Sequence, residues 1–150
     1  MILRWFIQAS LQELVHAGDR VLSVSGVFSG SLSYLLTKYD GKQSFTELVK
    51  KACDAGITEP DPREDLSGTD VQRKLLILSR IAGYVINLDD IDVEPLLPEQ
   101  LLAGSLADFW SRADQIDEFM QSAYDKAQQQ NNSNGPQGMH EKIHRQIAAL

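Results

Sequence analysis

The stretch TEPDPREDLSGTDVQRK, residues 58–74, joins an acidic, proline-containing loop to the start of a helix. Pro60 and Pro62 keep the residues before them out of the helical conformation, so the loop is expected to be extended. Ser67 is predicted to cap the following helix, over residues 69–83, because its hydroxyl can accept a hydrogen bond from the first turn. After Lys74 this helix is apolar on most faces, which is typical of a buried helix.

Hydrophobic periodicity on either side of this stretch predicts a mixture of helices and strands. Four further helices are expected, over residues 10–20, 29–41, 44–56 and 106–129. Alternation of apolar and polar residues predicts short strands at residues 21–28 and 91–94. The predicted fold class is therefore α+β, with a small, mixed β-sheet covered by several helices. Two short strands make a poor sheet alone, so either a second copy of the chain or the terminal segments would have to extend it.

The helix expected at residues 44–56 carries the clearest end signals. Ser44 stands three residues before Glu47, as in a capping box, and Gly56 provides a stop. The same helix contains Cys53, the one cysteine of the chain. One thiol cannot form an internal disulfide, which favours a reducing compartment, and no obvious base accompanies it, so Cys53 is interpreted as a packing residue.

Composition excludes several classes of partner. The chain has 150 residues, enough for one domain with a buried core, and a net charge of −7. An acidic chain is a poor ligand for nucleic acid or an anionic membrane surface. No apolar run reaches membrane-spanning length, and the first residues lack a convincing signal-peptide cleavage pattern. A cytoplasmic location is therefore expected.

The last residues are expected to lie apart from the domain. Residues 1–130 are predicted to form one domain, and residues 131–150 a polar linker followed by a short amphipathic helix. This helix contains HEKIH, from His140 to His144, which fits the H-E-x-x-H zinc motif. A catalytic zinc needs a third ligand, and the one remaining histidine is His16. We therefore favour an exposed histidine pair over a zinc hydrolase, and we predict no metal site.

The acidic stretch itself is a candidate ligand site. Asp70 and Lys74 are one helical turn apart and therefore neighbours. Rigid carboxylates beside a partly desolvated lysine can bind a ligand ammonium, orient a hydroxyl and supply a proton. The structural alternative is a solvated acidic loop with an exposed ion pair, which contributes little to stability. From the residue types alone, this alternative is favoured.

Two segments favour the ligand-site interpretation over the solvated loop, because they resemble segments of a known family. AGITEPDPREDLSGTDVQRK, residues 55–74, closely resembles the signature segment of homoserine dehydrogenases, and SGVFSGSLSYLLTKYDG, residues 25–41, resembles the segment that precedes it at the same spacing. GSLADFW, residues 104–110, is most similar to the bifunctional aspartokinase/homoserine dehydrogenases, with the methionine-branch type as candidate subgroup. The resemblance runs from about residue 11 to 126.

The resemblance implies an activity and a role for each residue that matches the signature. The family reduces L-aspartate 4-semialdehyde to L-homoserine with NADH or NADPH, in threonine, methionine and isoleucine biosynthesis. Glu59 and Asp70 match the residues that hold the amino acid, and Asp65 matches a further substrate-binding acid of the site. Lys74 matches the proposed catalytic proton donor or acceptor. These roles suit the chemistry, since carboxylates bind an ammonium and a lysine stabilises a developing alkoxide.

The sequence also departs from the family. Glu64 stands where aspartate is common, and Ile57 stands where tyrosine is common. No predicted strand leads into G-x-G-x-x-G, so the nucleotide-binding domain and its active-site lysine are missing from this chain. The chain therefore looks like an excised catalytic domain. NADP or NAD is expected to serve the full-length enzyme, and this chain alone is expected to bind neither tightly and to be inactive.

A second interpretation stays open. The chain could be a catalytically dead remnant that acts as an oligomerisation or interaction module. Trp5, Phe6, Phe109 and Trp110 are candidates for an apolar surface that a partner would cover. The family resemblance implies a homo-oligomer in either case, so association does not separate the two interpretations. Binding of the amino-acid substrate does.

Overall fold

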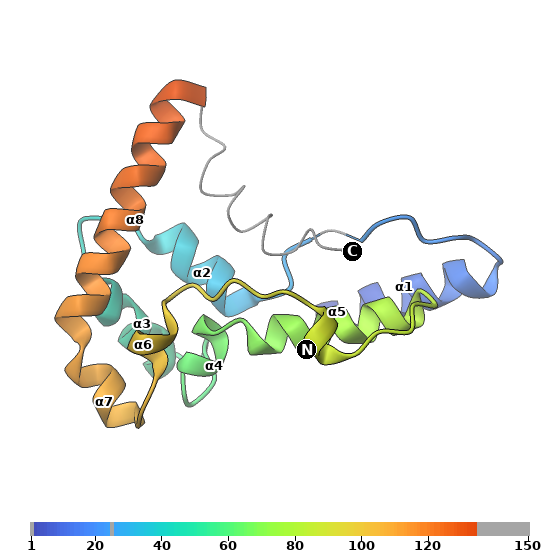
Figure 1. The fold of residues 1–150 in the computed structure, drawn as a ribbon, viewed down its shortest axis with the longest axis horizontal. Coiled ribbons are helices and arrows are strands. Elements are labelled where there is room, and N and C mark those ends of the chain that lie inside the picture. The colour runs from blue at the N-terminus through green and yellow to red at the C-terminus, as the bar shows by residue number, and fades with distance from the viewer. Residues whose placement is uncertain (1, 25, 135–150) are drawn as a thin grey trace.

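The computed structural model describes residues 2–24 and 26–134, and this part of the chain is built from helices (Figure 1). In chain order the elements are α1 (Ile2–His16), α2 (Gly30–Lys38), α3 (Phe45–Asp54), α4 (Arg63–Leu66), α5 (Thr69–Ile81), the 3-10 turn η1 (Leu88–Asp90), α6 (Glu99–Leu102), α7 (Leu106–Ser111) and α8 (Ala113–Asn134). In Figure 1, α8 lies at one end of an elongated molecule, and α1 and α5 lie together at the other.

The larger of two cores lies at the α8 end. Helix α3 packs between α2 and α8, and side chains from α7 and from the segment before α6 complete the interior. We call this group the main core; its buried members are Leu32, Leu35, Tyr39, Phe45, Leu48, Val49, Ala52, Leu66, Leu97, Phe109, Ile116 and Met120. Tyr39 contacts Phe45 edge to face, with ring centroids 5.3 Å apart. Such pairs add to the stabilisation that apolar burial supplies.

Helix α3 begins where the sequence predicts it. The Ser44 hydroxyl accepts the Glu47 N–H at 3.1 Å, which confirms the predicted N-cap. The carboxylate of Asp117, on α8, in turn accepts the Ser44 hydroxyl at 2.5 Å, the Thr46 N–H at 2.8 Å and the Thr46 hydroxyl at 3.0 Å. One carboxylate on α8 therefore accepts three hydrogen bonds from the start of α3 and holds the two helices together.

The smaller core lies at the α5 end. Its buried members are Val71, Leu75 and Ile91, and we call it the minor core. Helix α1 packs against α5. The expectation that α5 is buried on most faces is wrong, because Ile77 leaves 38% of its surface exposed while Leu75 is buried. Helix α5 is thus a helix with one buried side.

The predicted α+β fold is wrong for the part of the chain that the structure describes, which contains no strand or sheet. The alternation implied a non-helical backbone, and the structure agrees at residues 21–24 and 26–28. Among the described residues, however, no strand lies beside this segment to pair with it. The Val21 carbonyl instead accepts the Tyr84 hydroxyl at 3.2 Å. Alternation predicts an extended backbone, whereas a strand also requires a partner for its N–H and C=O groups.

The second predicted strand, at residues 91–94, is replaced by a turn and a loop that lie on α5. The turn η1 precedes it, and Ile91 and Val93 pack into the minor core. The side-chain amide of Gln72, on α5, donates to the Leu88 and Ile91 carbonyls at 3.1 and 3.0 Å. A helix side chain therefore supplies donors that a neighbouring strand would otherwise provide.

Two helix boundaries also differ from expectation. The helix predicted for residues 106–129 is divided into α7 and α8 at Arg112, and the helix predicted to begin at residue 10 begins at residue 2. Helix α7 has its own start, because Ser105 and Asp108 form a reciprocal capping box.

Phe109, predicted to lie on an apolar surface, is fully buried in the main core. The amphipathic segment with His140 and His144 lies outside the described residues.

Candidate active site

The candidate site residues lie where three segments of the chain meet. These segments are the start of α2, the acidic loop at residues 58–62 with α4, and the first turns of α5. Helix α4 packs against both α2 and α5, which brings the segments together between the two cores. The four side chains singled out in the sequence all belong to this junction; they are Glu59, Asp65, Asp70 and Lys74.

Lys74 is held from two directions. Its ammonium donates to the Phe28 carbonyl at 2.7 Å and forms an ion pair with the Asp70 carboxylate, one turn back on α5. The side chains are 22% and 42% exposed, for Lys74 and Asp70 respectively. Asp70 and Lys74 are thus neighbours as the spacing indicates, and the Phe28 contact adds a bond across 46 residues. The ammonium is consequently fixed beside the start of α2, on a side chain that is partly exposed.

Asp65 links the acidic loop to α2. It is buried, and its Oδ1 accepts the Ser31 hydroxyl at 2.5 Å while Oδ2 accepts the Glu59 N–H at 2.9 Å. The Ser31 hydroxyl also lies 3.0 Å from the Ser29 hydroxyl, which caps α2 by accepting the Leu32 N–H. Asp65 is therefore bound to protein through both oxygens, and each oxygen retains a lone pair.

Glu59 differs from Asp65 in what its side chain contacts. Asp65 holds the backbone of Glu59, whereas the Glu59 side chain is exposed, and among the described residues none forms a hydrogen bond or ion pair with its carboxylate. An anchored backbone with a free carboxylate limits the positions that the charge can reach, and less freedom is lost when a ligand binds. Of the three substrate-binding candidates, Glu59 is the most available to a cation.

Helix α5 does not start as predicted. Its N-cap is Gly68, with φ of +76°, and not Ser67. The Ser67 hydroxyl accepts the Thr69 N–H of the first turn, as predicted, but at a long 3.4 Å, and it donates to the Glu64 carbonyl at 3.0 Å. A side chain at position 68 would be strained by the left-handed backbone, and its Cβ would come within 2.7 Å of Val93 Cγ1. Gly68 therefore permits the tight connection between α4 and α5 that places Asp65 and Asp70 in one site.

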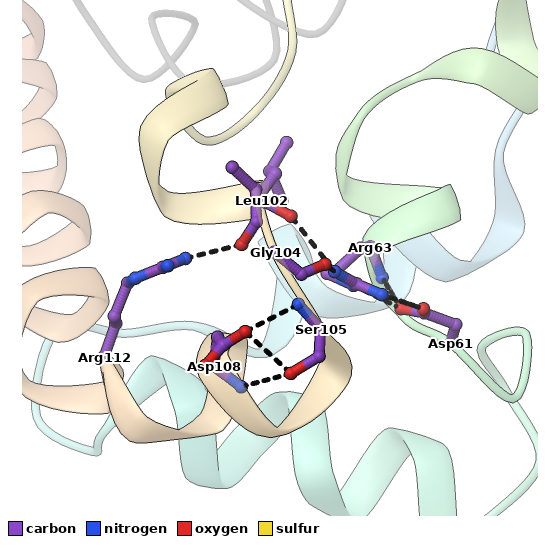
Figure 2. A network of polar contacts seen from close by, with 8 residues as sticks. Asp61, Arg63, Leu102, Gly104, Ser105, Asp108 and Arg112 are labelled. Carbon is purple, nitrogen blue, oxygen red and sulfur yellow. Dashed lines mark hydrogen bonds and ion pairs between the residues drawn. The ribbon is translucent and has the colours of Figure 1, made fainter.

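An arginine that the sequence analysis missed holds the acidic loop from its other side (Figure 2). Arg63 forms an ion pair with Asp61 at 2.5 Å, and its Nη1 donates to the Leu102 and Gly104 carbonyls at 3.2 and 2.6 Å. The hydrogen bonds from Arg63 lower the pKa of the Asp61 carboxyl. The close spacing of Asp61 and Arg63 could have indicated their ion pair. The carbonyls that also bind Arg63 lie about 40 residues further along the chain, so no local pattern indicated them.

Ser29 and Ser31 were also missed as members of the site. Their segment was interpreted only as part of a predicted helix and of the family resemblance. A serine immediately before a helical pattern is an N-cap signal, which could have identified Ser29. The Ser31–Asp65 hydrogen bond spans 34 residues and has no local signal.

The described residues show no arrangement typical of a metal centre or a membrane anchor. Groups of three or more His, Cys, Asp or Glu side chains able to hold a metal ion are absent from residues 2–24 and 26–134. Within the same residues, no helix is both long enough and apolar enough to cross a bilayer. The junction does hold the carboxylates of Glu59, Asp65 and Asp70 and the ammonium of Lys74. In general, carboxylates can bind an ammonium and a lysine can exchange a proton.

Comparisons with known proteins agree with the resemblance of the signature segment. A family model described as homoserine dehydrogenase matches residues 7–135. Bifunctional aspartokinase/homoserine dehydrogenase 2 of Escherichia coli is 49% identical over 114 residues, which cover 76% of this chain and 14% of that protein. Homoserine dehydrogenase of Schizosaccharomyces pombe is 46% identical over 101 residues, covering 63% of this chain and 27% of that protein.

A solved structure matches the fold of this chain. A protein of unknown function from Candida auris matches with a TM-score of 0.69 and 38% identity, over 83% of this chain and 36% of that one. The chain thus spans a small part of the length of these relatives. With a family model over most of its residues and relatives well above 30% identity, the chain belongs to the homoserine dehydrogenase family.

Proposed function

We propose that this chain supplies the substrate-binding and proton-transfer half of a homoserine dehydrogenase site. The reaction is the reduction of L-aspartate 4-semialdehyde to L-homoserine in amino-acid biosynthesis. The observation that carries the proposal is the position of Lys74, whose ammonium is fixed by the Phe28 carbonyl and Asp70 beside the acidic loop. Family membership supports the reaction class, and this geometry supports the choice of Lys74 and Asp70.

Three carboxylates bind the substrate in this proposal. Glu59 and Asp70 are accessible, and they accept hydrogen bonds from the α-ammonium of the amino acid. Asp65 contributes from a fixed position, through the lone pairs left after it has bonded Ser31 and the Glu59 N–H. Each charge-assisted hydrogen bond is worth roughly 1.5–3 kcal/mol, so two or three of them can select an amino acid over the corresponding simple aldehyde.

Lys74 is the catalytic residue in this proposal. As the aldehyde carbon gains a hydride, its oxygen develops the charge of an alkoxide, and an ammonium within hydrogen-bond reach stabilises that charge. Lys74 then gives a proton to this oxygen, which completes the hydroxyl of homoserine; in the reverse direction it accepts the proton. Asp70 keeps the ammonium aligned through the ion pair on α5.

The remaining components lie outside the described residues. No described segment combines a strand with a glycine-rich phosphate-binding turn, so these residues do not fit a dinucleotide. We propose that NADP or NAD binds to another part of the full-length protein, and that the isolated chain binds neither tightly. A homo-oligomer and a cytoplasmic location are part of the same proposal, the latter supported by a single, unpaired cysteine.

Ligand binding to the isolated chain tests the substrate half of the proposal. L-Homoserine, added to millimolar concentration, is expected to shift the backbone NMR signals of Glu59, Asp65, Asp70 and Lys74. Glu59→Gln should weaken binding about tenfold, the loss of roughly one charge-assisted hydrogen bond. Glu47→Gln, at an exposed glutamate on α3, is the matched control and should leave binding unchanged. Shifts spread evenly over the chain, or none, would contradict a preformed substrate site.

A chimeric enzyme tests the catalytic role of Lys74. Residues 7–135 of this chain, which the family model matches, would replace the corresponding segment of the Escherichia coli relative, of which the match covers 14%. Lys74→Ala is expected to lower kcat by about 100- to 10,000-fold, the usual worth of a general acid. Lys50→Ala, at an exposed lysine on α3, should leave kcat unchanged. Full turnover by the Lys74→Ala chimera would refute the assignment.

An interaction module is the second candidate function. Several large apolar side chains of the described residues are exposed, chiefly around α1, α5 and the segment between α1 and α2; they include Leu14, Leu22, Val27, Ile77, Tyr84 and Val85. Exposed apolar groups that gather in one region favour a partner surface. This candidate predicts association that depends on concentration and no response to L-homoserine, which the titration above distinguishes.

A further inference from the structure

We propose that Arg63 is a positioning residue that fixes the substrate-binding loop in place through a bridge to the turn between α6 and α7. The inference rests on the proposed function, because it assigns the loop at residues 58–62 to substrate binding. It adds a residue outside the set matched to the family signature. Arg63 does not touch the substrate in this proposal, and it acts through the positions of Glu59 and Asp65.

The guanidinium of Arg63 contacts two separate parts of the chain. Toward the loop, Nε donates to both oxygens of Asp61 at 2.9 and 3.1 Å, and Nη2 donates to Oδ2 at 2.5 Å. Toward the turn, Nη1 donates to the Leu102 and Gly104 carbonyls. A planar guanidinium can make both sets of contacts at once, whereas the ammonium of a lysine cannot reproduce this fork.

The loop side of this bridge leads directly to the substrate residues. Asp61 also accepts the Arg63 N–H at 3.0 Å, so the turn at residues 61–63 is closed on itself. Glu59 lies two residues before this turn, and its N–H donates to the Asp65 carboxylate. Asp65 lies two residues after the turn. Arg63 therefore holds the middle of a segment whose two ends carry proposed substrate ligands.

The anchor side of the bridge is rigid. Ser105 follows Gly104 and caps α7, and its N–H and hydroxyl both donate to the Asp108 carboxylate, at 2.8 and 2.7 Å. Gly104 has φ of +87°, and a Cβ there would meet Asp108 Oδ2 at 2.8 Å, so the turn is tightly packed against the cap. The Gly104 carbonyl is therefore a hydrogen-bond acceptor in a fixed position for the Arg63 guanidinium.

A second arginine donates hydrogen bonds to the same turn, so its role can be compared with that of Arg63. Arg112, between α7 and α8, donates to the Ala103 carbonyl at 2.7 Å and to the Leu101 carbonyl at 3.5 Å. Figure 2 shows Arg112 and Arg63 both directed at this turn. The two arginines thus bind alternate carbonyls of one short segment. Arg63 alone of the two is also bonded to the acidic loop. Removing either one loosens the turn, but removing Arg63 also frees the loop.

Paired substitutions in the full 150-residue chain test this inference. Arg63→Met and Arg112→Met each remove one guanidinium from the turn, and Arg63→Lys keeps the charge without the fork. Amide hydrogen exchange at Glu59 and the dissociation constant for L-homoserine are measured for each variant. Arg63→Met is expected to speed Glu59 exchange and to weaken L-homoserine binding, each about tenfold. Arg63→Lys should fall between Arg63→Met and the unchanged chain, and Arg112→Met should change neither quantity by more than about twofold.

The two readouts separate failure of this inference from failure of the proposed function. If the unchanged chain binds L-homoserine and Arg63→Met binds it equally well, the inference is overturned and the proposed function stands. If the unchanged chain does not bind, the proposed substrate site is overturned, and exchange at Glu59 still decides whether Arg63 holds the loop. Equal effects of Arg63→Met and Arg112→Met on exchange would show a general structural role and overturn the positioning role.

Discussion

The two ends of the molecule bury their apolar side chains to very different extents. The main core joins residues from α2, α3, α7 and α8, and many of its members have no exposed surface. The minor core has three buried members, and the segments around it leave Leu22 81% exposed and Val85 fully exposed. Because stabilisation follows the apolar area removed from water, the α8 end should carry most of the folding free energy. The candidate site lies where these two ends meet.

The largest expected effect compares one leucine from each core. Leu35→Ala is expected to lower the free energy of unfolding by about 4 kcal/mol, and Leu75→Ala by about 2–3 kcal/mol, because the less enclosed site can relax around the lost atoms. Ile77→Ala, on the exposed side of α5, should cost roughly 0.5 kcal/mol or less. Urea denaturation of the three variants measures the differences. An equal cost for Leu35 and Leu75 would refute the contrast between the cores.

A smaller effect is expected where α8 holds the start of α3. Asp117→Ala removes the acceptor for Ser44 and Thr46 and should cost about 2–3 kcal/mol of unfolding free energy. Asp117→Asn keeps one acceptor oxygen and should cost about half as much. Glu118→Ala, at the exposed neighbouring position, is the control and should be near neutral. If Asp117→Ala were also neutral in thermal or chemical denaturation, the contact would not stabilise the α8 end.

The smallest expected effect lies in the loop between the two ends and depends on pH. Arg63 lowers the pKa of Asp61, so the folded chain binds this proton less readily than the unfolded chain does. The contribution is therefore present above the ordinary aspartate pKa of about 3.9 and is lost as the pH falls through the lower folded value. The stability difference between the unchanged chain and Asp61→Asn should be constant above about pH 5 and shrink below about pH 4.

The size of this pH effect should stay below about 1 kcal/mol, because the ion pair is partly exposed to water. The same comparison made in an Arg63→Met background is the control. There the pKa of Asp61 loses its largest cause of perturbation, the side-chain hydrogen bonds from Arg63, but keeps the backbone N–H of residue 63, so the change with pH should become smaller. A pH dependence of unchanged size would assign the effect to a group other than the Arg63 guanidinium.

Elements with local signals were predicted well. Helix α3 starts after Ser44, carries an apolar stripe and is followed by Gly56 with φ of +67°, and each of these features can be read within one window of sequence. The neighbouring placement of Asp70 and Lys74 follows in the same way from helical spacing. Local signals are sufficient here because the interacting groups are a few residues apart.

Elements that depend on distant partners were not predicted. The alternation at residues 21–28 indicated an extended backbone, but only the tertiary structure shows whether another strand lies beside it. The bonds from Arg63 to the α6–α7 turn and from Ser31 to Asp65 join residues more than 30 positions apart. Nothing in the composition of either segment specifies the other as its partner.

The sequence by itself determined the start of α3, the neighbouring placement of Asp70 and Lys74 and, through the signature segment, the family of the protein and the four residues proposed for its site. These features depend on residue types at fixed, short separations along the chain. Only the tertiary structure decided that Asp65 is bonded through both oxygens, that the exposed Glu59 carboxylate has no hydrogen-bond partner among the described residues, and that Arg63 bridges the loop to the turn before α7. These properties depend on which distant groups satisfy each buried or charged atom, and the packing of the whole chain sets that choice.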